Sequence, residues 1–340
     1  MRLRDTYIFT VLILLLVFCF IMNISLGSVS IPFKEVFAGV FGNAANTSWQ
    51  YIIQDYRLPK AFTAILVGSG LGISGVLMQT LFRNPLAGPF VLGISSGASL
   101  GVALMILGSS LFSGVFASMM SSQWSLVVAA SIGSFVVLIV VLLVSSKVRD
   151  TMAILIIGLM FGSITAALVS VLSYFSSAEQ LQQYIFWGFG SLGNHSWNEL
   201  AVFFSIYSIG ILLAVISIKS LNTFLLGEHY AKSLGLNVKK SRFFIILATS
   251  ILAGGITAFT GPIAFIGLAI PHIARQIFNT SNHKILVPGV CLIGAVIMLI
   301  CDSIAQLPSS DYTLPINAIT SLFGAPVVIW LLVRQRKMVF

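Results

Sequence analysis

Long apolar runs cover most of the chain and are separated by short breaks that carry charge or Pro and Gly. About 20 mostly apolar residues in a helix cross the roughly 30 Å hydrocarbon core of a bilayer. The pattern therefore predicts an all-α integral membrane protein with about ten transmembrane helices, in one transmembrane domain over residues 1–340. The predicted spans are 7–27, 58–81, 91–108, 124–146, 151–172, 198–218, 243–260, 262–278, 287–305 and 315–333.

Composition supports this prediction, because 58% of the residues are hydrophobic and only 8% are charged. Soluble domains average about 45–50% apolar and about 25% charged residues, so a water-soluble protein is excluded. Arg2 and Arg4 before the apolar run 7–22 imitate a secretory signal peptide. No small-x-small cleavage site follows closely, and we interpret this run as an uncleaved first span.

The charged residues predict the orientation of the spans. With a cytoplasmic N-terminus, all but three of the eighteen Lys and Arg residues fall in cytoplasmic segments, and the exceptions are Lys34, Arg57 and Lys60. Cytoplasmic loops of membrane proteins carry an excess of Lys and Arg. We therefore expect both termini in the cytoplasm, and the net charge of +9 needs no nucleic-acid partner.

The largest predicted cytoplasmic loop covers about residues 219–242. It reads as a short amphipathic helix ended by Gly235, with Leu226, Ala231 and Leu234 at helical spacing. A solvated loop needs no such apolar stripe, so these side chains should pack against another surface. The spacing leaves open whether that surface belongs to this chain or to a partner.

On the predicted outer side, Arg57 and Lys60 begin the second span against the general charge trend. A single interfacial cation is usually an anchor whose charged end reaches the headgroups. Two cations three residues apart favour a docking site for an acidic partner.

Small and polar residues form stripes at helical spacing on the fifth and tenth spans. Such a stripe either packs against another helix or lines a wet path through the protein. The two sets are Ser163, Ala167, Ser170 and Tyr174 on the fifth span, and Asn317, Thr320, Ser321 and Gly324 on the tenth.

Several motifs typical of chemistry are missing or have another explanation. The pattern G-x-G-x-x-G at 70–75 lies inside an apolar helix and indicates close packing, as do Gly93, Gly97 and Gly101. No phosphate-binding G-x-x-x-x-G-K-[ST] pattern occurs, and no span has a central carboxylate or Lys; His272 beside Pro271 is typical of a packing residue. We expect no catalytic residue, metal site or bound cofactor in this chain. If ATP drives its activity, another chain must bind the ATP and Mg²⁺ and hydrolyse the ATP.

Taken together, the motifs resemble the permeases of bacterial ABC importers for iron-siderophores, haem and cobalamin, the FecCD type. The resemblance runs nearly end to end and rests on the order and spacing of many short strings. These strings are 57–60 (Arg-Leu-Pro-Lys), 75–79, 83–87 (Arg-Asn-Pro-Leu-Ala), 92–98, 186–188 with 190–191, 227–235, 261–268, 271–275, 314–315 and 324–326.

The resemblance implies the architecture of a type II ABC importer permease in the bacterial inner membrane. It implies a homodimer whose translocation path lies at the subunit interface, beside the fifth and tenth helices. It further implies that the cytoplasmic loop forms coupling helices in the groove of an ATPase dimer. The implied coupling residues are Leu226, Gly227, Glu228, Ala231, Leu234 and Gly235.

The family's leading Arg and the basic residue three positions later receive an extracytoplasmic ligand-binding protein, and Arg57 and Lys60 match these positions. The family often has a further Arg before the last span, where this chain has Gln306 and the segment 309–313. Docking would then depend more on Arg57, Lys60 and Lys34.

These observations predict the permease subunit of an ABC importer that moves an iron-siderophore, haem or cobalamin by alternating access. The alternative is a stand-alone secondary transporter of a small solute, which would need ionisable groups within the spans.

Overall fold

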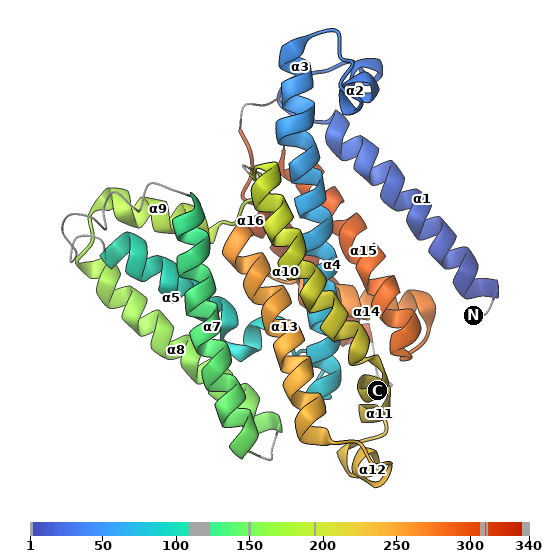
Figure 1. Ribbon diagram of the computed structural model, residues 1–340, viewed down its shortest axis with the longest axis vertical. Helices are drawn as coiled ribbons and strands as arrows, with labels where there is room; N and C mark the ends of the chain where they lie inside the picture. The colour runs from blue at the N-terminus through green and yellow to red at the C-terminus, as the bar shows by residue number, and fades with distance from the viewer. Residues whose placement is uncertain are drawn as a thin grey trace. The chain divides into compact units, whose positions relative to one another are not determined.

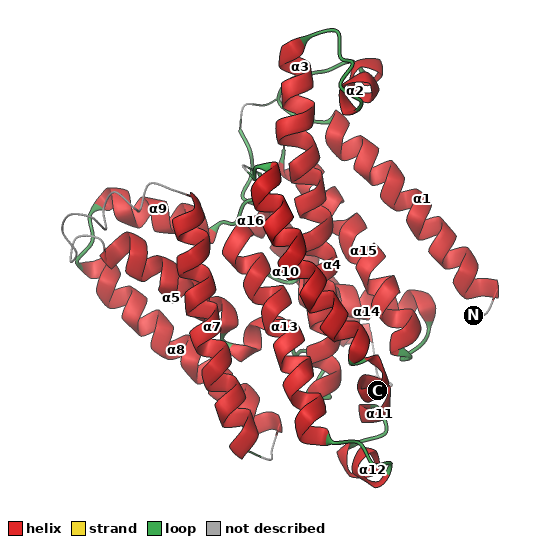
Figure 2. Cartoon of the chain, viewed as in Figure 1, coloured by secondary structure: helices red, strands yellow, loops and turns green. Residues whose placement is uncertain are grey.

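The computed structural model describes residues 3–108, 123–148, 151–193, 195–306, 310 and 312–334, and within these ranges the chain forms helices and no strands (Figure 2). Ten helices correspond to the ten predicted spans, which confirms the predicted all-α fold. They are α1 (Leu3–Ser25), α4 (Leu58–Leu81), α5 (Ile94–Ile106), α7 (Gln123–Lys147), α8 (Thr151–Tyr174), α10 (Trp197–Ile216), α13 (Val238–Thr260), α14 (Ile266–Phe278), α15 (His283–Ala305) and α16 (Ile316–Arg334).

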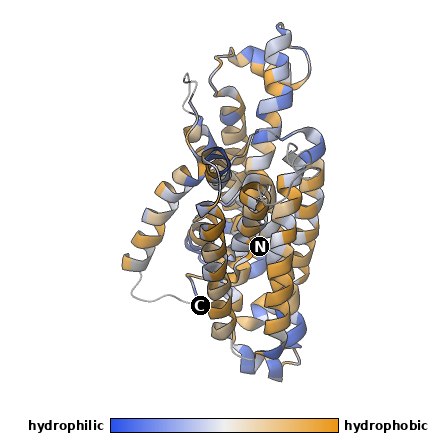
Figure 3. Ribbon diagram, turned by 90° about the vertical axis from the view of Figure 1, so that its left-hand side faces the viewer, coloured by the Kyte–Doolittle hydropathy of each residue, from blue (hydrophilic) through white to orange (hydrophobic). Residues whose placement is uncertain are grey.

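Seven helical stretches in the described part of the chain are long and apolar enough to cross a membrane. Two shorter apolar helices, α5 and α16, add to them, and α14 has thirteen residues with Pro271 inside it. The long helices are hydrophobic through most of their length (Figure 3).

Short helices connect the long ones, and most of them were not predicted from the sequence. They are α2 (Phe33–Val40), α3 (Thr47–Tyr51), the π-helical η1 (Ile52–Arg57), the 3₁₀-helical η2 (Pro89–Leu92), α9 (Ala178–Gly188), α11 (Ile218–Phe224) and α12 (Glu228–Ser233). Local capping explains α9, because Ser177 and Gln180 exchange side-chain and backbone hydrogen bonds in a capping box. A helix of eleven residues is too short to give the apolar signal of a span.

The chain divides into two compact units, each described here by itself. Unit 1 comprises Met1–Ile73, Ser191–Ser205 and Ala264–Val339. In it α15 packs against α1, α14 and α16 (Figure 1). Backbones also approach closely, because a Cβ on Gly68 of α4 would lie 2.1 Å from the carbonyl oxygen of Gly294 on α15. A Cβ on Gly72, within the pattern 70–75, would lie 2.7 Å from Cγ1 of Val290 on α15, so the predicted close packing of this span is confirmed.

The course of the chain in unit 1 places both of its ends on one side. Arg4 donates to the carbonyl oxygen of Phe278 at the end of α14, and Asn23 lies against Leu299 and Asp302 near the end of α15. Helices α1 and α15 therefore run in the same direction. A hydrogen bond from Leu314 N to Ala305 O turns the chain back into α16. This course agrees with the prediction that both termini lie in the cytoplasm.

Unit 2 comprises Ser74–Gly190 and Ile206–Ile263 among the described residues. Its centre is α5, which contacts α7, α8, α9 and α13. A Cβ on Gly97 or Gly101 would lie 2.5 or 2.1 Å from backbone oxygens of α7. The smooth glycine face predicted on this span is therefore a helix-packing face, because larger side chains would separate α5 from α7. The expected single domain over residues 1–340 remains a prediction.

Candidate functional site

The predicted coupling loop is built from α11, α12 and the start of α13, all in unit 2. Gly227 (φ +100°) and Gly235 (φ +83°) adopt positive φ on either side of α12, where residues with a Cβ are strained. Asn237 then caps α13, because its side chain accepts a hydrogen bond from Lys240 N at 3.0 Å. The short helix followed by Gly235 that the sequence predicts is confirmed.

One face of this loop is apolar and open. Leu226, Tyr230 and Leu234 recur every four residues and are 60%, 56% and 59% exposed. Ala231 is fully buried, so it belongs to the inner face of α12 and not to the exposed stripe. The prediction that Ala231 shares the stripe of the two leucines is therefore wrong; Tyr230 takes that place, as the i, i+4, i+8 spacing from Leu226 indicates. We call Leu226, Tyr230 and Leu234 the exposed apolar face of the coupling loop.

The opposite, polar side holds α12 to the rest of unit 2. Glu228 pairs with Lys232 at 2.9 Å and with Arg242 of α13 at 3.5 Å. Arg242 is almost completely buried and also donates to Val148 O at 3.2 Å, at the end of α7. One guanidinium therefore joins the loop, α13 and the turn before α8. Nothing in the spacing of these residues along the chain predicted this contact.

The loop before η2 contributes to the same region. A Cβ on Gly227 would lie 3.5 Å from Nη1 of Arg83, so this guanidinium rests against the backbone at the start of α12. Arg83 itself has a positive φ of 48°, which is uncommon for a residue with a side chain. The strings 83–87 and 227–235 of the sequence therefore meet in space.

The polar stripe on α8 lies on the surface of unit 2. Ser163, Ala167, Ser170 and Tyr174 are all exposed, and Tyr174 is 84% exposed. Ser163 and Ser170 donate to carbonyl oxygens four residues earlier, as hydroxyls in an apolar environment do. Only 17% of the most apolar stretch of α8 is buried, so this helix has a large surface that can contact lipid or another chain.

The polar stripe on α16 behaves differently, because it packs inside unit 1. Thr320 is fully buried, and the side chain of Asn317 accepts a hydrogen bond from Ala264 N at 3.0 Å. Ser321 donates to Asn317 O at 2.6 Å. Gly324 is also buried, and a Cβ there would lie 2.3 Å from Cβ of Phe265. The packing alternative therefore describes this stripe, and its role in a path stays a prediction.

The predicted docking cations at the start of α4 are turned inward. Arg57 is 5% exposed and donates to the carbonyl oxygens of Ile24, Ser25 and Val29, at 3.0, 3.0 and 2.5 Å. It thereby satisfies the free carbonyls at the end of α1, where the helix dipole also favours a cation. Lys34 is the exposed member of the predicted trio.

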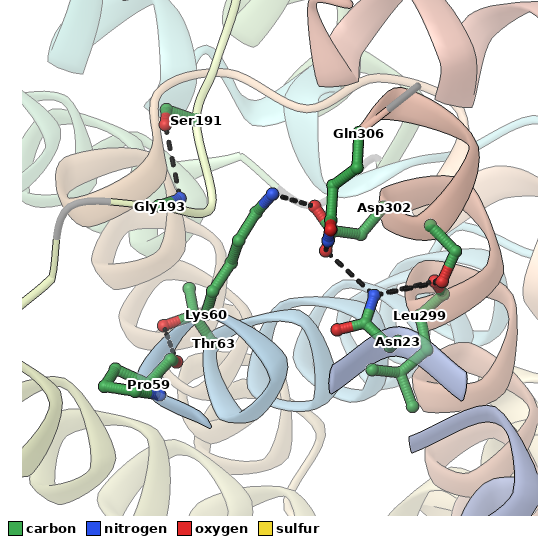
Figure 4. A network of polar contacts seen from close by, with 10 residues as sticks. Asn23, Pro59, Lys60, Thr63, Ser191, Gly193, Leu299, Asp302 and Gln306 are labelled. Atoms are coloured by element: carbon green, nitrogen blue, oxygen red, sulfur yellow. Dashed lines mark hydrogen bonds and ion pairs between the residues drawn. The ribbon is translucent and has the colours of Figure 1, made fainter. Parts of the chain in front are cut away.

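Lys60 belongs to a buried polar network in unit 1, shown in Figure 4. Its ammonium pairs with Asp302 at 3.1 Å, and the other oxygen of this carboxylate accepts from Asn23 at 2.9 Å and Gln306 at 2.8 Å. A buried carboxylate needs such partners to offset its desolvation. Gln306, where the family often has an Arg, thus has a structural role here. Asp302 and Asn23 were not identified as partners from the sequence.

A cavity of about 170 Å³ lies beside these cations in unit 1. It is lined by Tyr56, Arg57, Lys60, Gln306 and residues of the chain after α1. No group of three or more potential metal ligands occurs among the described residues, and Cys19, Cys291 and Cys301 are not joined in disulfides.

Comparison with known proteins relates this architecture to membrane transport. The model of the FecCD transport family matches residues 15–334. The hemin transport system permease protein HmuU of Yersinia pestis is 34% identical over 327 residues, which is 96% of this chain and 95% of that protein.

The vitamin B12 import system permease protein BtuC of Salmonella typhi is 34% identical over 297 residues, 87% of this chain and 88% of that protein. A solved structure described as a metal-chelate type ABC transporter in an inward-facing conformation superposes with a TM-score of 0.83 at 32% identity, and covers 97% of this chain and all of that one. The chain therefore belongs to the FecCD transport family and is the multi-pass membrane permease of an ATP-binding-cassette importer.

Proposed function

We propose that this permease acts as a homodimer in the bacterial inner membrane and translocates an iron chelate, haem or a cobalamin-type ligand by alternating access. The ligand class is supported by relatives named for hemin and vitamin B12 and by the metal-chelate type neighbour. A periplasmic or lipid-anchored binding protein delivers the ligand, and a separate ATPase dimer that binds ATP and Mg²⁺ drives the cycle. The permease holds the ligand weakly in both states, so that the ATPase sets which side is open.

The observation that carries this proposal is the exposed apolar face of the coupling loop. Leu226, Tyr230 and Leu234 form an exposed apolar patch on and beside the short helix α12, where the chain turns at Gly227 and Gly235. A soluble surface rarely keeps such side chains uncovered without a partner. An amphipathic helix seated in a groove of the ATPase buries them, as helix-in-groove recognition generally does.

The polar side of the loop supplies the mechanical link in this proposal. Glu228 and Arg242 connect α12 to α13, and Arg242 reaches Val148 before α8. A displacement of α12 by the ATPase would therefore reach α8 through a buried guanidinium. The exposed stripe of Ser163, Ala167, Ser170 and Tyr174 on α8 is proposed to face the second subunit and the path. Asn317, Thr320 and Ser321 on α16 would reach the path only if α16 repacks.

The outer side of the permease is proposed to dock the binding protein through its cations. Lys34 is available to an acidic partner as the structure stands. Arg57 and Lys60 would first have to exchange the carbonyls of α1 and the carboxylate of Asp302 for carboxylates of the binding protein. Such an exchange keeps each charge partnered throughout, which a buried cation requires.

The test is to co-express the tagged permease with its cognate ABC ATPase and to purify the pair. Leu234→Asp places a charge in the apolar face and should abolish co-purification and ATP-driven uptake. His229→Asp is the matched control, because His229 is exposed on the same helix outside that face. An unchanged complex with Leu234→Asp would show that the ATPase binds elsewhere on the permease.

A further inference from the structure

A second exposed apolar stripe lies on α2, in unit 1. Phe33, Phe37 and Phe41 recur every four residues and are 57%, 45% and 76% exposed. The rings of Phe33 and Phe37 meet edge to face, with centroids 5.3 Å apart. Two exposed phenylalanines on α2 and a third at its C-cap, Phe41, form an apolar patch that indicates a partner surface.

The other face of α2 is firmly packed. Val36 is 1% exposed, and a Cβ on Gly39 would lie 2.4 Å from Cδ1 of Ile53, which is fully buried. Glu35 accepts a hydrogen bond from Ala45 N at 2.8 Å, so its carboxylate holds the loop after α2. The contacts of this buried face fix the orientation of α2, and the three phenylalanines are therefore on its exposed side.

The position of α2 places this stripe at the depth of the lipid headgroups. Helix α1 has 23 residues, about 35 Å at the usual rise, so its end at Ser25 lies near the boundary of the hydrocarbon core. Arg57 holds Val29 beside the carbonyls of Ile24 and Ser25. Because α2 begins only four residues after Val29 and contacts α1, it cannot extend far into the aqueous phase.

Helix α1, which contacts α2, has an exposed apolar face of its own. Leu14, Phe18 and Met22 recur every four residues and are 64%, 60% and 40% exposed. Only 22% of the most apolar stretch of α1 is buried. The exposed face of α2 adds three phenylalanines and one cation, Lys34, without an exposed hydrogen-bonding aromatic or carboxylate. This composition is typical of a helix lying in the interface and fits anionic headgroups. A protein partner that binds and leaves in each cycle would favour a more polar face.

We infer that α2 is an interfacial helix that inserts Phe33, Phe37 and Phe41 into the outer leaflet and sets Lys34 among the lipid phosphates. It anchors the outer end of unit 1 next to the start of α4. The lipid bilayer thus binds this segment at its outer surface, in addition to surrounding the transmembrane helices.

Collision-accessibility measurements on spin labels test this inference. The full-length chain, with Cys19, Cys291 and Cys301 replaced by Ala and its uptake activity verified, carries one label at Phe37→Cys or Phe41→Cys. It is placed in nanodiscs of phosphatidylethanolamine and phosphatidylglycerol. Ser48→Cys on α3 is the matched control, because Ser48 is exposed on a neighbouring polar helix.

Labels at positions 37 and 41 should collide several-fold more with oxygen than with a water-soluble nickel chelate, and the label at 48 should show the reverse. Equal or greater nickel accessibility at 37 and 41 overturns the inference. A loss of nickel accessibility there only after addition of the binding protein also overturns it, and assigns the stripe to protein docking.

A second measurement needs no substitution. Nanodiscs of the unmodified chain that contain a phospholipid with a diazirine in its acyl chain are illuminated, and peptides are analysed by mass spectrometry. The peptide with α2 should be labelled about as much as the peptide with Leu14–Met22, and several-fold more than α3. Labelling of α2 no higher than that of α3 contradicts the inference.

Discussion

The coupling loop of unit 2 and the outer network of unit 1, formed by Asn23, Arg57, Lys60, Asp302 and Gln306, both turn charged side chains toward the protein, but only the coupling loop leaves residues predicted to bind a partner exposed. In the coupling loop, Glu228 and Arg242 lie toward the protein, while Leu226 and Leu234 are exposed. In the outer network, the sequence predicts Arg57 and Lys60 as docking residues for an acidic partner, yet both are buried: Arg57 donates to carbonyl oxygens at the end of α1, and Lys60 pairs with Asp302. Charge along the chain therefore does not by itself mark a binding surface, because a cation close to helix ends and carboxylates finds partners within the fold.

The comparison predicts that the outer network contributes most to stability. Asp302→Ala would leave the ammonium of Lys60 buried without its carboxylate and should lower the free energy of unfolding by about 3–5 kcal/mol. The measurement is the thermal unfolding midpoint of the permease in nanodiscs. Lys284→Ala is the control and should leave the midpoint unchanged, because Lys284 is exposed and lies outside the proposed binding surfaces.

The double replacement of Lys60 by Met and Asp302 by Leu should recover most of the loss, since apolar residues can replace a buried ion pair. A full loss in the double variant would mean that Asn23 and Gln306, and not the ion pair, carry the effect.

The link in the coupling loop should have a smaller effect on stability and a large one on transport. Arg242→Ala removes charged hydrogen bonds to Glu228 and Val148 and should cost about 2 kcal/mol. Uptake per ATP hydrolysed in proteoliposomes should fall much more than co-purification of the ATPase. Lys232→Ala is the matched control, because it removes the exposed i, i+4 partner of the same Glu228, a pair worth about 0.5 kcal/mol or less. If both variants reduced coupling equally, the guanidinium would not be the link.

The two polar stripes provide the third prediction. Asn317→Ala leaves the N–H of Ala264 without its acceptor and should lower stability by about 1–3 kcal/mol. Ser170→Ala on the exposed face of α8 should change it by less than about 0.5 kcal/mol. Thermal unfolding of both variants in nanodiscs decides this. Equal effects would show that α8 is as firmly packed in the assembled protein as α16.

The smallest expected effect is a pH dependence at His195, before α10. Burial lowers the pKa of this imidazole, against the opposing influence of Glu199. The unfolded chain then binds the proton more readily than the folded one, so this contribution to stability is lost as the pH falls below about 6.5. Unfolding midpoints between pH 5 and 8 should fall less on acidification in His195→Gln than in the unmodified chain. An identical pH dependence in the two proteins would contradict this assignment.

The sequence predicted the architecture well, because a transmembrane helix is specified locally. Each span needs only about 20 apolar residues, and the distribution of Lys and Arg orients the series. Glycine spacing likewise predicted close packing at Gly72 and Gly97, which the structure confirms. The amphipathic helix before Gly235 was predicted for the same reason, since its turns and apolar period lie within ten residues.

Partners distant along the chain could not be predicted in this way. The contacts of Lys60 with Asp302, of Arg242 with Val148 and of Asn317 with Ala264 span from 53 to 242 residues, and no short period links them. Whether Ala231 or Tyr230 is exposed also depends on which side of α12 meets unit 2.

By itself, the sequence determined the number and direction of the helices, the position of the cytoplasmic loop and the family. The tertiary structure alone decided which polar and apolar side chains are buried, because burial depends on neighbours that only packing brings together. For Arg57 and Lys60 this decision changed the interpretation from exposed docking residues to cations that stabilise the fold.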